Sequence, residues 1–214
     1  MKRGAFILFE GVDRCGKTTQ TNRLLQNLKD RNAKVSLRRF PSSKPCTETT
    51  IGKIINSYLS NESNLEDRSI HLLFSADRWE CKEDIENTLA SGETILVDRY
   101  AYSGVAFTAA KGYDLEWCKS CDLGLPAPDK VIYLSMPIEE TSKRGNFGEQ
   151  RYEKVEFQKK VKKIFDEQLC EPSWSILNAQ RTIEELETQI LQIAERTIAE
   201  AELKPIEKLW LKNK

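Results

Sequence analysis

The sequence predicts an α/β fold, in which a parallel sheet of about five strands carries helices on both faces. Short apolar runs alternate with longer stretches in which apolar residues recur at helical spacing, and this alternation is typical of parallel sheets. A glycine-containing loop joins the first apolar run to the first helical stretch. Because no repeat, low-complexity tract or long Gly/Ser linker interrupts the alternation, we expect a single domain over residues 1–214.

The expected elements follow one another in a regular order. Ala5–Phe9 is a short, continuous apolar run, as in a strand buried on both faces, and Leu24, Leu25 and Leu28 share one face of the helix after it. The expected strands are Ala5–Glu10, Val35–Phe40, Thr94–Asp98, Lys130–Ser135 and Trp174–Asn178. The expected helices cover 17–32, 51–60, 68–91, 101–111, 153–171 and 181–201.

The loop after the first strand matches the phosphate-loop pattern G-x-x-x-x-G-K-[ST] over residues 11–18. In a strand–loop–helix context, backbone N–H groups and the helix N-terminus converge on a phosphate group. Gly11 and Gly16 permit the close approaches that this requires. Lys17 is expected to reach the β- and γ-phosphates, and the Thr18 hydroxyl is expected to ligate Mg²⁺. The pattern therefore predicts a sheet of the P-loop NTPase type.

A second ligand for the metal is predicted at the end of the third strand. Thr94–Asp98 is apolar and ends in an acid, the pattern of a Walker B strand that holds Mg²⁺ directly or through water. Arg99 follows at once, and a fixed cation at this place is expected to face an anionic ligand. The alternative is a buried Asp98–Arg99 ion pair that only orders the strand end.

Two loops are candidates for ligand contact. Pro41–Thr50 is polar and directly follows a strand, and ligands in open α/β sheets bind beyond the carboxyl ends of strands. Arg144–Arg151 carries two glycines and two arginines. It is either an ordinary solvated turn or a short mobile lid, over about 143–153, that brings arginine to a transferring phosphoryl group and excludes water.

Composition narrows the class of protein. Lys and Arg number 33, as do Asp and Glu, and this balance gives no sign of nucleic-acid binding. The N-terminal apolar run is shorter than the roughly 7 residues of a secretory segment or the roughly 20 of a membrane span. We expect a soluble protein without membrane association, in the cytoplasm, with the nucleus as the alternative.

The six cysteines do not predict a metal site. Only Cys118 and Cys121 have C-x-x-C spacing, no second pair completes a zinc site, and His71 is the single histidine. We expect reduced thiols, with neither zinc nor disulfides.

The motifs also separate the candidate kinds of phosphate-loop protein. A GTPase needs an N-K-x-D motif, which is absent, and the only D-x-x-G lies inside the phosphate loop at Asp13–Gly16. A compact chain with a second arginine site and a short lid favours a kinase for a small phosphorylated acceptor.

Several further motifs, in order, resemble those of the thymidylate kinase family. They are F-E-G-V-D-R-C-G-K-T-T-Q (9–20), Phe40-Pro41, H-L-L-F-S-A-D-R-W-E (71–80), V-D-R-Y-A-Y-S-G-V-A-F (97–107), G-L-P-A-P-D (124–129) and R-Y-E (151–153). The resemblance extends from about residue 4 to Leu209-Trp210 and is closest to the eukaryotic and poxviral branch. It implies transfer of the γ-phosphoryl group of ATP to dTMP, with Mg²⁺, giving dTDP and ADP for dTTP biosynthesis. It also implies a homodimer.

The resemblance implies roles for individual residues. Phe74 would stack on thymine and Arg78 would bind its carbonyl edge, Phe107 would exclude a 2′-hydroxyl, and Arg99 would hold the acceptor phosphate. The implied catalytic residues are Arg14, Lys17, Asp98, Arg99, Arg144 and Arg151, and the metal ligands are Thr18 and Asp98. ATP would contact Gly11, Arg14, Cys15, Gly16, Lys17, Thr18, Thr19, Asn178 and Gln180. Residues for dTMP would be Asp13, Phe40, Lys44, Phe74, Arg78, Arg99, Ser103, Gly104, Phe107, Tyr152 and Gln158.

One loop departs from the family pattern, and two other functions stay open. The family usually has an arginine shortly after the Phe-Pro pair, where this chain reads Ser42-Ser43-Lys44-Pro45-Cys46. Lys44 is a candidate substitute without the bidentate fork of arginine, or the loop is only a solvated insertion. The nearer alternative is a deoxynucleoside kinase, with Glu10 as base, or another kinase for a related pyrimidine nucleotide. The more distant one is a nucleotide-binding regulator without turnover.

Overall fold

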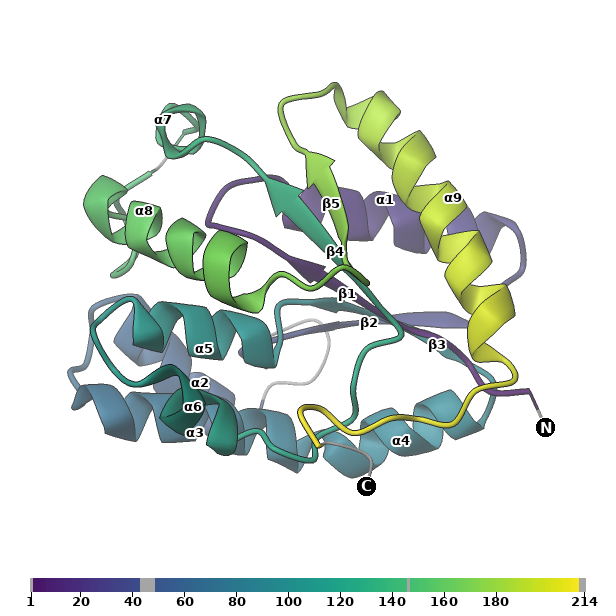
Figure 1. The fold of residues 1–214 in the computed structure, drawn as a ribbon, viewed down its shortest axis with the longest axis horizontal. Coiled ribbons are helices and arrows are strands. Elements are labelled where there is room, and N and C mark those ends of the chain that lie inside the picture. The colour runs from purple at the N-terminus through teal and green to yellow at the C-terminus, as the bar shows by residue number, and fades with distance from the viewer. Residues whose placement is uncertain (1, 43–48, 146, 212–214) are drawn as a thin grey trace.

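The computed structural model describes residues 2–42, 49–145 and 147–211. They form a parallel sheet in the order β2-β3-β1-β4-β5, coloured by residue number in Figure 1. The strands are β1 (Phe6–Glu10), β2 (Val35–Arg39), β3 (Thr94–Asp98), β4 (Lys130–Ser135) and β5 (Ser175–Asn178). The predicted five-stranded parallel sheet is therefore confirmed.

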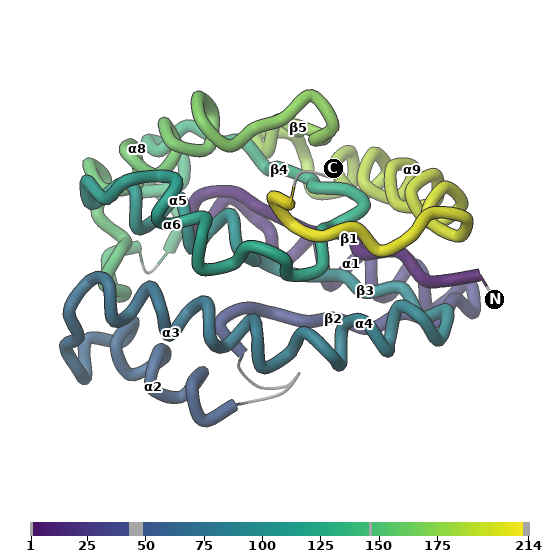
Figure 2. The backbone as a smooth tube through the Cα atoms, turned by 60° about the horizontal axis from the view of Figure 1, so that its bottom comes forward, coloured from purple at the N-terminus to yellow at the C-terminus, as the bar shows by residue number. Residues whose placement is uncertain are grey.

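Helices cover both faces of this sheet, as predicted. α1 (Lys17–Asp30) and α9 (Ile183–Ala201) pack on one face, whereas α4 (Lys82–Ala90), α5 (Ala101–Ala109) and α8 (Val155–Ile164) belong to the core of the other. β1 and β3 are buried throughout because helices cover both of their faces. α2 (Thr50–Leu59) and α3 (Asp67–Glu80) lie side by side and share a separate apolar cluster, visible along one edge of the molecule in Figure 2.

Two predicted helices are divided in the structure. The stretch 68–91 is interrupted at Cys81, whose backbone N–H donates to the Arg78 carbonyl (3.2 Å) three residues back, a tighter turn than an α-helix makes. The stretch 153–171 is helical only from Val155, and after α8 it widens into the π-helical turn η1 (Phe165–Leu169). Two short helices, α6 (Leu115–Ser120) and α7 (Ile138–Thr141), are additions to the predicted set.

The topology gathers the predicted functional residues at one edge of the sheet. The carboxyl ends of parallel strands meet at that edge, and the register pairs Phe9 with Asp98 and Arg39 with the same Asp98. The phosphate loop leaves β1 there and leads into α1. None of the helices among the described residues combines the length and the apolar character needed to cross a membrane.

Candidate active site

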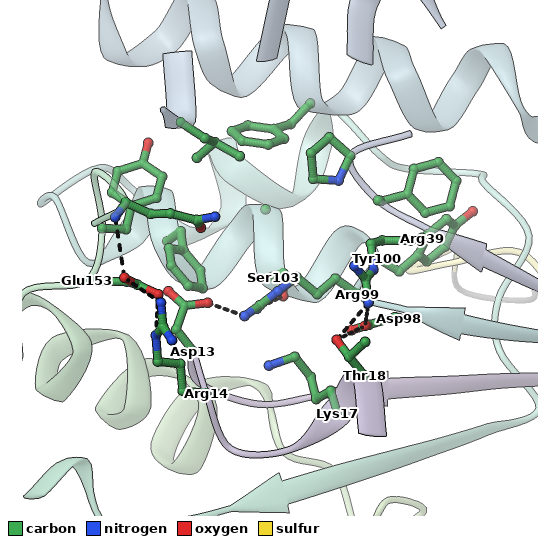
Figure 3. Close-up of a pocket in the computed structure, with 18 of the residues that line it drawn as sticks. Asp13, Arg14, Lys17, Thr18, Arg39, Asp98, Arg99, Tyr100, Ser103 and Glu153 are labelled. Atoms are coloured by element: carbon green, nitrogen blue, oxygen red, sulfur yellow. Dashed lines mark hydrogen bonds and ion pairs between the residues drawn. The ribbon is translucent and has the colours of Figure 1, made fainter. Parts of the chain in front are cut away.

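A cavity of about 580 Å³ opens at the carboxyl edge of the sheet. Figure 3 shows charged side chains from the phosphate loop, β2 and β3 converging on it. Of the residues predicted from the sequence, its lining includes Asp13, Arg14, Gly16, Lys17, Thr18, Thr19, Phe40, Phe74, Arg78, Asp98, Arg99, Ser103, Gly104, Phe107, Arg144 and Tyr152. Most of the candidate donor and acceptor residues therefore face one space.

The phosphate loop has the backbone that its glycines permit. Gly11 has φ 146°, and a Cβ at this position would lie 2.7 Å from the Leu134 carbonyl oxygen, so only glycine fits without movement. Lys17 is 5% exposed, and its ammonium donates to the carbonyl oxygens of Gly11 (3.1 Å) and Val12 (2.6 Å). The Cys15 side chain is buried with the apolar core below the loop.

Thr18 and Asp98 meet as the sequence predicts. The Thr18 hydroxyl donates to Asp98 Oδ2 (2.9 Å), and Arg39 Nη2 donates to both Thr18 Oγ1 (2.6 Å) and Asp98 Oδ2 (2.8 Å). The hydroxyl oxygen of Thr18 and the carboxylate oxygen of Asp98 are thus adjacent and already hold a cationic group. Oxygen atoms of this kind are the hard ligands that Mg²⁺ prefers. Arg39 is not among the residues predicted from the sequence, although it directly precedes Phe40 at the end of a predicted strand.

Arg99 is held by a set of partners that does not include Asp98. It has φ 70°, an unfavourable backbone angle for a residue with a side chain. Its guanidinium donates to Gly11 O (3.1 Å) and Ser103 Oγ (3.0 Å) and pairs with Asp13. Burial alone would lower the pKa of Arg99, but the charges of Asp13, Asp98 and Glu10 raise it. Arg99 is therefore a fixed cation in the wall of the cavity.

Glu10 has a structural environment. Its carboxylate is fully buried and accepts from the backbone N–H groups of Tyr100 (3.0 Å) and Ser103 (3.1 Å) and from Ser103 Oγ (2.6 Å). Burial raises the pKa of this carboxyl above its usual value. Its oxygens are used at the start of α5 and it does not line the cavity, so the geometry gives no support to Glu10 as a base.

The other wall of the cavity is aromatic, with one buried cation. Phe74 of α3 and Phe107 of α5 line it together with Arg78. Arg78 is 1% exposed and makes a two-bond pair with Asp122, from Nε to Oδ1 (3.0 Å) and from Nη2 to Oδ2 (2.6 Å). Gly104 lies against it, because a Cβ there would be 2.9 Å from Arg78 Nη2. Asp122 lies between the recognised motifs, and its residue type alone gave no sign of this role.

Gln158 connects the phosphate loop to the segment before α8. Its Nε2 donates to Asp13 Oδ2 (2.6 Å) and to the Tyr152 carbonyl (3.0 Å), and its Oε1 accepts from the Asp13 N–H (3.0 Å). Gln158 is fully buried, behind the lining of the cavity. It therefore orients Asp13 and Tyr152, which do line the cavity.

The two arginines of the predicted lid point in different directions. Arg144 Nη1 donates to the Arg14 carbonyl (2.7 Å) and lies at the cavity, where Arg14 is itself paired with Glu153 (2.6 Å). Burial alone would raise the pKa of the Glu153 carboxyl. Hydrogen bonds that it accepts from Arg14 and from backbone N–H groups outweigh burial and lower this pKa. Arg151 instead donates to the carbonyls of Tyr58 (2.7 Å) and Ser63 (2.7 Å), outside the lining of the cavity.

Two other predicted positions lie elsewhere, and a third is not among the described residues. Asn178, the last residue of β5, and Gln180 after it are both exposed, and the Gln180 N–H donates to Asn178 Oδ1 (3.0 Å). Neither lines the cavity. Lys44 falls outside the described residues. Within the described ranges, no group of three or more His, Cys, Asp or Glu side chains is arranged to hold a metal ion.

Comparison with known proteins gives a consistent result. Residues 9–190 match the family model for thymidylate kinase. The chain is 48% identical to a thymidylate kinase of Dictyostelium discoideum, over 98% of this chain and 93% of the relative. It is 43% identical to a thymidylate kinase of Homo sapiens, over 98% of each. A solved structure of thymidylate kinase from Candida albicans is 37% identical and has a TM-score of 0.86, covering 98% of this chain and 99% of that one.

Proposed function

The chain belongs to the thymidylate kinase family, and we propose that it passes the γ-phosphoryl group of ATP to dTMP in the cavity described above. The observation that carries this proposal is the meeting of two different walls in one cavity. One wall is a phosphate loop with the Thr18–Asp98 pair, and the other is an aromatic wall with the buried Arg78. The first suits a nucleoside triphosphate and the second a pyrimidine nucleotide.

At the donor wall, we assign the phosphates of ATP to the backbone N–H groups of the loop and the N-terminus of α1. Lys17, Arg14 and Arg144 supply the positive charge around the transferring group. Thr18 and Asp98 would hold Mg²⁺, which when bound offsets negative charge on the β- and γ-phosphates. Lys17 must then exchange its bonds to Gly11 and Val12 for phosphate oxygens.

At the acceptor wall, an aromatic face suits a pyrimidine ring, since stacking contributes about 1–3 kcal/mol per base. We assign this contact to Phe74 and the base edge to Arg78, whose orientation Asp122 fixes. Arg99 would bind the acceptor phosphate, for which its planar donors are suited. Asp13, oriented by Gln158, faces the sugar.

Chemistry at this site requires alignment and charge rather than a base. The transition state of phosphoryl transfer is loose and spreads negative charge over the equatorial oxygens. The oxygen of the acceptor phosphate is already ionised near neutral pH. Water competes as an acceptor, so we propose that the segment 143–153 acts as a lid on the single domain and excludes it.

We also propose a homodimer formed through the outer face of α3. Leu72 and Trp79 of α3 are 52% and 39% exposed, and Leu123 after α6 is 44% exposed. Large apolar side chains gathered on one surface are typical of protein interfaces.

The five described cysteines are free thiols, which supports a reducing compartment such as the cytoplasm, with the nucleus as the alternative.

Steady-state turnover with Mg-ATP tests the proposed function directly. Formation of ADP should be fastest with dTMP among nucleoside monophosphates and negligible with thymidine. A faster reaction with thymidine would favour the deoxynucleoside kinase, and no ADP release with any acceptor would favour a regulator. Light scattering of the wild type and of Leu72→Arg tests the dimer, because a charge at a buried contact should yield monomers.

A further inference from the structure

We propose that Arg39 is a second cationic contact for the acceptor phosphate and that Mg²⁺ bound with the donor nucleotide releases it for this role. This inference rests on the proposed function. It concerns a residue at the end of β2 whose guanidinium lies in the cavity beside Asp98 and Thr18, as Figure 3 shows. The residues of the acceptor wall already described include one cation for the phosphate, Arg99.

The position of Arg39 is set by the sheet. The parallel register of β2 and β3 pairs Arg39 with Asp98, and the side chains meet through one guanidinium nitrogen that donates to both Thr18 Oγ1 and Asp98 Oδ2. The Arg39 side chain is 39% exposed, whereas that of Asp98 is 4% exposed. The acid is therefore fixed, and the arginine has space in which to move.

The same two oxygens are the ones that suit Mg²⁺, so the guanidinium and the metal ion compete for them. A divalent cation has the higher charge and binds oxygen at shorter range, and its arrival would leave Arg39 next to a like charge. The guanidinium must then move to another anion. The acceptor phosphate beside Arg99 is the anion that the reaction brings into this cavity, and a planar guanidinium is suited to bind it.

A purely structural role for Arg39 makes a different prediction. Adjacent residues of a strand point to opposite faces, and Arg38 accordingly pairs with Asp84 on α4 (2.7 Å), away from the cavity. If Arg39 only holds Asp98, donor and acceptor binding are independent of it. If Arg39 is exchanged between Asp98 and the acceptor, Mg²⁺-nucleotide must strengthen dTMP binding, and by reciprocity dTMP must strengthen binding of the Mg²⁺-nucleotide.

Calorimetry of dTMP and of thymidine binding tests this exchange on wild type, Arg39→Gln and the matched control Arg38→Gln. Each of the two ligands is titrated into each protein under three conditions: without ADP, with ADP and EDTA, and with ADP and Mg²⁺. In wild type and Arg38→Gln, we expect ADP with Mg²⁺ to tighten dTMP binding by about fivefold or more, the low end of ordinary coupling. In Arg39→Gln the tightening should disappear. In the absence of dTMP, ADP with Mg²⁺ should bind to this variant more tightly than to the wild type. Thymidine affinity should be equal in all three.

Two results would overturn the assignment: wild-type coupling retained in Arg39→Gln, or equal loss of thymidine and dTMP affinity, which would indicate a structural role. Should Arg39→Gln fold poorly, Arg39→Lys keeps the charge but not the fork and should show a reduced coupling, so an unchanged value there also overturns it. Turnover of dTMP by the wild type is measured on the same preparation. Absent turnover contradicts the proposed function, whereas turnover with unchanged coupling contradicts only the role of Arg39.

Discussion

At the donor end of the cavity, residues 11–18 supply backbone and side-chain groups from one continuous segment, joined by Asp98 and Arg39 from neighbouring strand ends. At the acceptor end, most side chains come from α3, α5 and the segment leading into α8, with Arg99 following β3 and Asp13 contributed by the loop. The donor end is fixed mainly by backbone geometry, through Gly11 and the helix N-terminus. The acceptor end is fixed by side-chain pairs, such as the buried Arg78–Asp122 pair and the partly buried Gln158–Asp13 pair.

This difference separates the effects expected of substitutions. A donor side chain such as Lys17 bonds only to its own loop, so its loss should affect chemistry and leave the fold intact. An acceptor side chain that is part of a buried pair contributes to folding as well, since breaking such a pair leaves a buried charge without its partner. Binding and stability should therefore change together at the acceptor end and separately at the donor end.

The largest effect is expected at the donor end. Lys17→Met should lower kcat by at least about 100-fold, the scale for removing one electrostatic stabiliser of a transition state. Thermal unfolding should stay close to that of the wild type, because the ammonium bonds only within its own loop, to the carbonyls of Gly11 and Val12 and to Cys15 Sγ. A variant that keeps more than half of the wild-type turnover would contradict the assignment of the phosphate loop.

At the acceptor end, Gly104→Ala should raise the KM for dTMP about tenfold, equivalent to about 1.4 kcal/mol. The added Cβ would lie 2.9 Å from Arg78 Nη2, and the two bonds to Asp122 keep Arg78 from yielding. The KM for ATP, measured in the same assay, is the internal control and should not change. Equal changes in the KM for dTMP and the KM for ATP would show that the acceptor end and the donor end of the cavity do not respond independently to substitution.

A third prediction concerns pH and the support of the acceptor wall. His71 is fully buried between α3, α5 and α6, where its Nδ1 contacts Thr108 Oγ1 (2.8 Å) and its Nε2 contacts the Cys118 carbonyl (3.0 Å). Burial, and then the charge of Arg78, lowers its pKa below the usual 6.5, although Asp122 opposes this. The unfolded chain therefore binds the proton more readily, and the free energy of unfolding should fall as pH drops below about 6.5.

The measurement is denaturant unfolding between pH 5.5 and pH 7.5 (about the range in which histidine titrates), on wild type and His71→Gln. The wild type should lose at most about 1.4 kcal/mol per pH unit from this group, and the variant should lose less. Glu10 has the opposite sign, since its raised pKa favours the folded state at lower pH, so the difference between the two proteins isolates His71. If the free energies of unfolding of the two proteins changed in parallel with pH, His71 would not be the origin of the pH dependence.

The same contrast explains how far the sequence could predict the site. The phosphate loop was predictable because its ligands are consecutive and its chemistry depends on local backbone. Arg39 was missed because only the strand order places the end of β2 beside Asp98. Asp122 was missed because its partner Arg78 is 44 residues away. Arg144 and Arg151 belong to one loop in the sequence, and only the structure separates the one at the cavity from the one that anchors the loop to α2.

The smallest effect is expected from Lys44, in the loop that departs from the family pattern. The described residues on each side of this loop are joined to one buried acid, because the Ser42 N–H and the Thr49 hydroxyl donate to Asp77 (2.8 and 2.7 Å). If Lys44 contacts the acceptor phosphate, Lys44→Ala should raise the KM for dTMP a few-fold and leave that for ATP unchanged. Added salt should remove most of this difference, because exposed charges are screened over about 10 Å at 0.1 M. Kinetics at two salt concentrations decide the question. Identical dTMP dependence in the two proteins would exclude Lys44 and leave Arg99, with Arg39, as the cations at the acceptor phosphate.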